Sequence, residues 1–305
     1  MTFDLTSYMD EAGHCDDPTR HYVGMAGFVA PAVMWEDFDV AWKAILNDFG
    51  LKEPFHMKDF AHFHGQFEVG WKGDENKAKR DKLFGALMAA IKETEATPVG
   101  AIISVEDFNG LTKCQRDSFR GPYFIAFQFV TRGAALEGAF GLEPEKVAMV
   151  YAYNQEYGTI SSPEPYSVDQ SGRAESLWHA MKETTDWGKW MGAYASSTPT
   201  EISALQAADI FAYELAKEFE TLVNPNPRPM RYGLRQILQM TSFPHSLIRL
   251  LDRMELLRLV IESRMPCQMG TDEVPKDQML VARRSLVEWM QDRGKLISEI
   301  GDSEL

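Results

Sequence analysis

The hydrophobic and polar positions of the first 222 residues predict short strands that alternate with longer helices. Short stretches rich in Val, Ile, Gly and aromatic residues are typical of strands, and they lie at 3–9, 21–30, 98–105, 146–153 and 190–196. Apolar residues at helical spacing predict helices, at 31–48, 75–93, 122–140, 171–182 and 199–222. The first two strands form an expected antiparallel hairpin. This order predicts an α/β protein.

The same pattern predicts two parts of unequal size. Residues 1–223 form the predicted α/β domain, with a helical excursion inserted after the second strand. The Pro-rich sequence NPNPRP at 224–229 then interrupts the pattern and predicts a linker. Residues 224–305 are expected to be a helical C-terminal extension, with helices at about 246–263 and 276–300. Its apolar face is expected either to pack on the domain or to form a homodimer seam.

Composition indicates a folded protein that does not cross a membrane. The 305 residues are 45% hydrophobic and 25% charged, which is typical of globular chains. The longest uncharged stretches are too short to span a bilayer, and the first residues lack a secretory signal pattern. The three cysteines are widely spaced and predict neither a disulfide framework nor a zinc site. We therefore expect a reducing, cytoplasmic location.

The net charge of −14 argues against a protein that coats nucleic acid without specificity. The charge is uneven, because residues 225–305 hold 12 basic and 11 acidic residues whereas the rest of the chain is strongly acidic. Arginines are frequent between 228 and 264, and Arg231 and Arg235 are candidate ligands for substrate phosphates, since the guanidinium fork binds oxygens in pairs. The alternative is a solvated helix face with local ion pairs.

The helix predicted at 199–222 carries an acid where a core residue is expected. Thr198 and Pro199 predict its start, and Glu201 completes a capping box. Asp209 then lies in the middle of the apolar stripe, flanked by alanines. Burying a carboxylate costs on the order of several kcal/mol unless hydrogen-bond donors or a cation compensate its charge. Asp209 is therefore either bonded to backbone amides or an arginine, or it is a metal ligand.

Other acids are expected to join Asp209 at one edge of the sheet. Asp10 and Glu11 end the first predicted strand, and Glu156 follows the fourth, with Asn154 nearer its end as a neutral ligand. Adjacent strand residues face opposite ways, so Asp10 is expected to enter the site and Glu11 to be its neighbour or a turn former. Carboxylate oxygens from Asp10, Glu156 and Asp209 would suit Mg²⁺ or Mn²⁺.

Three short sequences resemble motifs of one protein family. MDEAG at 9–13 resembles the opening D-E-S/A-G motif of the domain-of-unknown-function family 3800, in the ribonuclease H-like superfamily. LQAADIFAYE at 205–214 resembles its Q-A-A-D signature, and FHMKDF at 55–60 is similar to a segment of some branches. The resemblance covers about residues 3–222.

This resemblance implies a ribonuclease H-like, mixed five-stranded sheet flanked by helices, and a metal-dependent phosphodiesterase. It assigns Asp10 to the first-strand acid and Asp209 to the last-helix acid, and it assigns Glu156 to the fourth-strand acid only approximately. Superfamily nucleases often carry a further acid in the first helix after the third strand. Residues 122–136 contain none, and Glu137 comes only at the end of that helix.

These observations lead to a nuclease hypothesis with two alternatives. In the nuclease, catalytic Asp10, Glu11, Glu156 and Asp209 act with Mg²⁺ or Mn²⁺ on nucleic acid, and His56 donates a proton or contacts phosphate. Asp59 would orient His56, and Asn154 would help to bind substrate. The first alternative is an inactive ribonuclease H-like scaffold that binds protein or nucleic acid, for example in phage defence or a mobile element. The second, a hydrolase using Cys15 or Ser7, lacks the G-x-S-x-G elbow.

Overall fold

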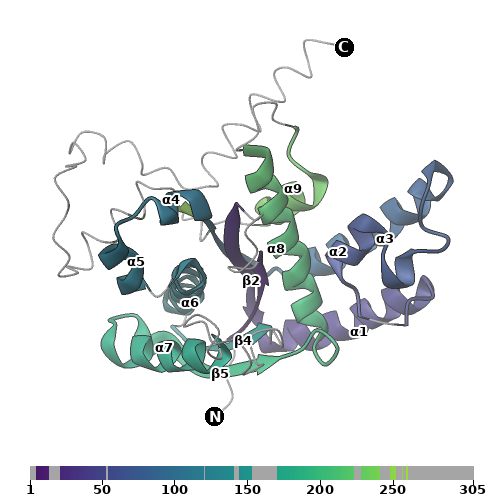
Figure 1. Cartoon of the computed structure of the whole chain (residues 1–305). Coiled ribbons are helices and arrows are strands. Elements are labelled where there is room, and N and C mark those ends of the chain that lie inside the picture. The colour runs from purple at the N-terminus through teal and green to yellow at the C-terminus, as the bar shows by residue number, and fades with distance from the viewer. Residues whose placement is uncertain are drawn as a thin grey trace, which may run out of the picture.

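The protein is a three-layer α/β structure in which helices cover both faces of one sheet (Figure 1). The computed structural model describes residues 5–13, 21–52, 54–119, 121–140, 144–152, 170–222, 228–240 and 248–251, together with 256 and 259. Every statement below concerns these residues. The expected α/β class is confirmed.

The sheet has six strands in the order β5-β4-β1-β2-β3-β6. Their bounds are β1 (Leu5–Ala12), β2 (Tyr22–Pro31), β3 (Thr97–Ser104), β4 (Val147–Ala152), β5 (Met191–Ser197) and β6 (Ile248–Leu251). β2 runs antiparallel to both β1 and β3, and the other pairs are parallel. The predicted hairpin and the five expected strands are therefore present, and β6 is an additional strand.

Two sets of helices bury the two faces of this sheet. On one face, α8 (Ser203–Leu222) crosses β1 and β2, and α1 (Ala32–Asp48) packs beside it. On the other face lie α6 (Pro122–Phe140) and α7 (Gln170–Thr184), with the short α4 (Val105–Asn109) and α5 (Lys113–Phe119) (Figure 1). The side chains of β1 alternate between two hydrophobic cores. Tyr8 and Ala12 face α8, whereas Met9 packs on the α6 side.

The excursion after β2 contains α1, α2 (Met57–His62) and α3 (Lys77–Glu93), and an aromatic cluster packs it together. Phe55, Phe60 and Phe67 form edge-to-face or tilted ring contacts with centroids 5.3 to 5.8 Å apart. The sequence around these residues has no clear period, so a loop is expected over 53–71, and α2 is missed for that reason. Aromatic packing, rather than an amphipathic stripe, holds this short helix.

A glutamine side chain on α8 ties the excursion to the domain. Gln206 Oε1 accepts hydrogen bonds from the Trp42 indole N–H and the Phe55 backbone N–H, both at 2.8 Å. Its amide nitrogen donates to the Pro199 carbonyl at 2.8 Å. Because Gln206 is buried, these bonds satisfy polar groups that would otherwise be costly.

Two predicted element boundaries are wrong. β1 continues to Ala12, so Asp10 and Glu11 lie within the strand, because their backbones pair with Ala26 and Met25 of β2. α8 begins at Ser203 rather than at 199. The preceding residues form a turn in which the Thr198 carbonyl accepts hydrogen bonds from the Glu201 and Ile202 amides, at 3.0 and 3.1 Å.

The C-terminal extension also differs from the expectation of a purely helical segment. Residues 248–251 form β6, which pairs with β3, so the helix predicted over 246–263 is wrong there. Burial explains the difference, since Ile248 and Leu251 are fully buried, one in each core. An unpredicted helix, α9 (Tyr232–Leu238), packs on α8. The helix expected at 276–300 lies outside the described residues.

Two further expectations concern the environment of the chain. Among the described helices, none is long and apolar enough to cross a membrane. Cys114 in α5 is disulfide-bonded. Since disulfides are rare in the cytosol, Cys114 does not support the reducing compartment inferred from cysteine spacing.

Replacing Gly27 with alanine should severely destabilise the fold. A Cβ at Gly27 would lie 1.9 Å from the Tyr8 carbonyl oxygen, in the strand pair that carries Asp10. We expect Gly27→Ala to lower the free energy of unfolding by about 3 kcal/mol, measured by urea denaturation. Gly85→Ala in α3 is the matched control, because nothing lies within 4 Å of its Cβ position. It should stabilise the protein by about 0.5–1 kcal/mol, and equal effects of the two variants would contradict this account of the β1–β2 contact.

Candidate functional site

Asp10 and Asp209 lie on the same side of the sheet. Asp10 stands between Tyr8 and Ala12 in the alternation of β1, and both of those residues pack in the core beneath α8. Asp209 is on α8, and its side chain is only 13% exposed. The fold therefore brings together two carboxylates that are remote in the sequence, as expected from the sequence.

The electrostatics of Asp10 reflect this proximity. Burial raises the pKa of the Asp10 carboxyl well above its ordinary value, and the negative charges of Asp209 and Glu11 raise it further. A hydrogen bond from the Glu11 backbone N–H to Asp10 Oδ1, at 2.8 Å, and the charge of His56 act in the opposite direction. The donors around Asp10 thus fail to offset the cost of its negative charge.

Glu11 does not enter the site from the same side. Its neighbours in the alternation, Met9 on β1 and the paired Met25 on β2, pack in the core on the α6 side. Glu11 acts on Asp10 through its charge and its backbone amide. A direct catalytic role for the Glu11 side chain, one of the sequence expectations, finds no support in this geometry.

The segment before α2 binds directly to Asp209. Asp209 Oδ2 accepts a hydrogen bond from the Met57 backbone N–H at 2.6 Å and lies 3.0 Å from His56 Nδ1. The hydrogen bond with Asp209 raises the pKa of the His56 imidazole to about 9, against the effect of burial. The charges of Asp209, Asp59 and Asp10 add to this rise. His56 is therefore protonated at neutral pH and forms an ion pair with Asp209.

The sequence analysis expected Asp59 to orient His56, and this is wrong: the residue that contacts the His56 ring is Asp209. Asp59 lies in the first turn of α2 and influences His56 only through its charge. His62 and His64 have exposed side chains whose rings stack with centroids 6.0 Å apart, away from the Asp209 hydrogen bonds. Of the three histidines in this stretch, only His56 reaches the acid pair.

Gln206 is a residue of the site that the sequence analysis missed. Gln206 and Asp209 are three positions apart on α8, so their side chains lie on the same helix face. Together they accept the backbone N–H groups of Phe55 and Met57, which fixes the approach of the segment that carries His56. The Q-x-x-D spacing is the signal that could have indicated this pairing.

Arg231 has a structural partner instead of being free for phosphate. Its Nε and one terminal nitrogen donate to the Glu214 carboxylate at 2.8 to 3.0 Å, and the Glu214 side chain is only 1% exposed. This bidentate pair joins α9 to α8 and compensates a buried charge. Arg235 is exposed, and one of its terminal nitrogens donates to the Met230 carbonyl at 3.2 Å. The expectation that Arg231 binds substrate is therefore not supported.

The predicted third ligand of the site lies outside the described residues. Glu156 and Asn154 follow β4 in the sequence, and the described part of β4 ends at Ala152. β4 runs parallel to β1, and Tyr151 pairs with Met9, so this strand ends beside Asp10. The part of the chain that the structure describes contains no group of three or more His, Cys, Asp or Glu side chains that could hold a metal ion.

The two described carboxylates fit a magnesium-type ion better than a metal that needs a full protein cage. Mg²⁺ usually keeps several water ligands and is held by one or two carboxylates together with substrate phosphates. The unfavourable ionisation of Asp10 is the observation that a bound cation would correct. Asp209 would contribute through Oδ1, since its Oδ2 already accepts from Met57 and pairs with His56.

Comparison with known proteins adds no family to this description. No protein-family model, no curated protein and no solved structure matches the chain.

Proposed function

We propose that the protein is a divalent-metal-dependent phosphodiesterase that acts on nucleic acid, with Asp10 and Asp209 as the described ligands of Mg²⁺ or Mn²⁺. The observation that carries this proposal is that two carboxylates remote in the sequence, on β1 and α8, lie on the same side of the sheet, where burial and then the charge of Asp209 raise the pKa of Asp10. In the metal-free protein a proton on Asp10 relieves this repulsion, while Asp209 is paired with His56. A divalent ion would offset the charge of both.

Three groups of this chain have distinct roles in the proposed reaction. A bound Mg²⁺ or Mn²⁺ would polarise the scissile phosphate and lower the pKa of a water molecule. Asp10 and Asp209 hold and orient the ion. His56 is protonated at neutral pH and 54% exposed, so it suits proton donation to the leaving oxygen or contact with a phosphate. With a pKa of about 9, it does not suit the role of general base.

The fold is compatible with the ribonuclease H-like assignment that the family 3800 resemblance implies. The sheet is mixed, with β2 antiparallel to its neighbours and helices on both faces. In this assignment Glu156 or Asn154, which follow β4, completes the ligand set. The net charge of −14 implies that substrate binding depends on the bound ion and on a narrow local surface.

A second candidate function is a scaffold without catalysis that binds protein or nucleic acid. It is favoured by the contacts of Asp209, whose Oδ2 already accepts from the Met57 amide and pairs with His56. In this case the Q-x-x-D motif serves only to dock the excursion on α8. Titration calorimetry with Mg²⁺ and Mn²⁺ separates the two functions, because the scaffold binds neither ion.

Asp10→Asn is expected to stabilise the metal-free protein and to abolish its response to metal. Ionised Asp10 is disfavoured in the folded protein, so the neutral amide should raise the metal-free Tm by about 2–4 °C, the equivalent of ~1 kcal/mol. The wild-type protein should gain about 2.7 kcal/mol at Mn²⁺ concentrations of 100 times Kd, and the variant should gain none. Mn²⁺-dependent cleavage of labelled oligonucleotides should be lost.

The control for this variant is Asp48→Asn, which removes one exposed carboxylate at the end of α1. It should leave the Mn²⁺ response and the cleavage unchanged. Asp209→Asn tests the second ligand but also weakens the contact with His56 and Met57, so thermal stability must be measured beside activity. Undiminished cleavage by Asp10→Asn would remove Asp10 from the site.

The protonation of His56 should be visible directly by NMR titration. The folded-state pKa is raised to about 9 from the ordinary 6.5, so the stability contributed by the His56–Asp209 pair is fully present below about pH 6.5. It is lost as the pH rises through 9. We expect the imidazole shifts of His56 to titrate near pH 9, and near pH 6.5 in Asp209→Asn. A His56 midpoint below 7 in the wild-type protein would contradict the ion pair and the proton-donor role.

A further inference from the structure

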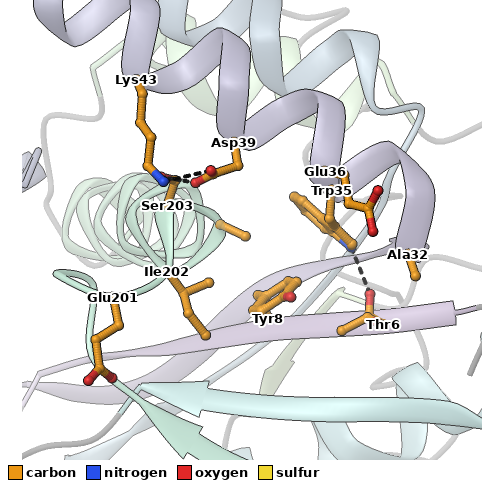
Figure 2. A pocket seen from close by; sticks show the side chains of 11 residues that line it. Thr6, Tyr8, Ala32, Trp35, Glu36, Asp39, Lys43, Glu201, Ile202 and Ser203 are labelled. Atoms are coloured by element: carbon orange, nitrogen blue, oxygen red, sulfur yellow. Dashed lines mark hydrogen bonds and ion pairs between the residues drawn. The ribbon is translucent and has the colours of Figure 1, made fainter. Parts of the chain in front are cut away.

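A cavity of about 460 Å³ lies on the α8 side of the sheet, separate from the acid pair. It is bounded by the first half of α1, by β1, and by the turn that leads into α8 (Figure 2). Asp10, His56 and Asp209 do not line it. Its volume is in the range of small-molecule sites, which is about 300–1,000 Å³.

Two aromatic rings form a fixed part of the cavity wall. Tyr8 and Trp35 meet edge to face with centroids 5.0 Å apart. The Trp35 indole N–H donates to the Thr6 carbonyl at 3.0 Å, which holds this ring in place (Figure 2). Burial, and then the charge of Asp39, raise the pKa of the Tyr8 phenol, so it stays neutral. Aromatic faces of this kind attract cations and apolar groups.

The charged groups of the cavity leave an excess of negative charge. Three carboxylates, Glu36, Asp39 and Glu201, line it together with one cation, Lys43. Lys43 and Asp39 neutralise each other, with Nζ 2.6 Å from Oδ2, and Ser203 Oγ donates to the other Asp39 oxygen at 2.7 Å. Among the residues that the structure describes, neither Glu36 nor Glu201 has an ion pair, so the lining keeps an excess of two negative charges. Both side chains are exposed at the rim, and Ser197 Oγ donates a hydrogen bond to Glu201 Oε2 at 2.7 Å.

Apolar side chains provide room for a short aliphatic body between these groups. Ile202, Ala32 and Ala204 line the cavity beside the rings, and Figure 2 shows Ile202 next to Tyr8 above β1. An anionic ligand such as a nucleotide would meet the repulsion of Glu36 and Glu201. A cation with an apolar stem would meet carboxylates at the rim and ring faces inside.

We propose that this cavity binds a small organic cation, an alkylammonium or alkylguanidinium with a short aliphatic chain. The site is independent of the proposed phosphodiesterase activity, because the two share no lining residue. The negative charges of Glu36 and Glu201 attract the charged head at the rim, and the half-buried Tyr8 ring, held by buried Trp35, contacts the cation and its stem.

Calorimetric titration of the full chain with butylguanidinium and with agmatine tests this site. Measurements at roughly 0.15 M salt suppress the general attraction of an acidic protein for cations. We expect saturable binding of one equivalent, weakened about tenfold in Glu36→Gln/Glu201→Gln, that is by ~1.4 kcal/mol. The control Asp37→Asn/Asp48→Asn removes two exposed carboxylates of α1 that do not line the cavity, and it should bind as the wild type does.

The aromatic contribution is tested at Tyr8. Tyr8→Phe keeps the ring and should keep binding, whereas Tyr8→Leu should weaken it, with Tm measured to show that the fold persists. Equal binding by the Glu36→Gln/Glu201→Gln protein and its control would overturn the proposal. So would non-saturable binding by the wild type, or preferential binding of a matched anion such as butyrate.

Discussion

A carboxylate within the helix that covers the sheet is the constraint on which the site depends. α8 buries its apolar stripe against β1 and β2, and Asp209 interrupts that stripe beside Asp10. The fold compensates Asp209 with a backbone amide and a protonated imidazole, both from the segment before α2. It offers Asp10 little beyond the neighbouring amide of Glu11. The asymmetry leaves one compensated acid and one uncompensated acid at the same place.

The rest of the architecture positions this pair. The antiparallel β1–β2 hairpin fixes the register of Asp10, and close packing at Gly27 leaves no freedom for that register to shift. Gln206 binds the excursion to α8 through Trp42 and Phe55, so the aromatic cluster of the excursion and the domain core form one continuous body. Arg231 and buried Glu214 attach α9 to the same helix. α8 thus carries the polar contacts that join three separate parts of the chain.

Much of this fold follows from periodicity, and the misses have identifiable physical causes. α6 begins and ends at the predicted residues because its apolar run is long and bounded by Pro122. The residues of β6 were predicted as helix because a four-residue strand at a sheet edge is too short to show a period of its own. Asp209 was found by its unusual position, since a carboxylate in an apolar stripe is costly, and Asp10 was found because it follows the first predicted strand. The roles of Gln206 and Arg231 depend on partners far away in the sequence, so spacing alone could not reveal them.

The contact between Met57 and Asp209 has a consequence for communication within the molecule. Asp209 Oδ2 accepts the Met57 amide and also pairs with His56. A ligand that binds the same oxygen therefore competes with the docking of the excursion on α8. Because such coupling is reciprocal, a change that strengthens the docking of the excursion on α8 weakens the affinity for that ligand by the same factor. Order in the α1–α3 region is therefore linked to the binding of any group at Asp209 Oδ2, whereas an ion held by Oδ1 leaves the docking contacts in place.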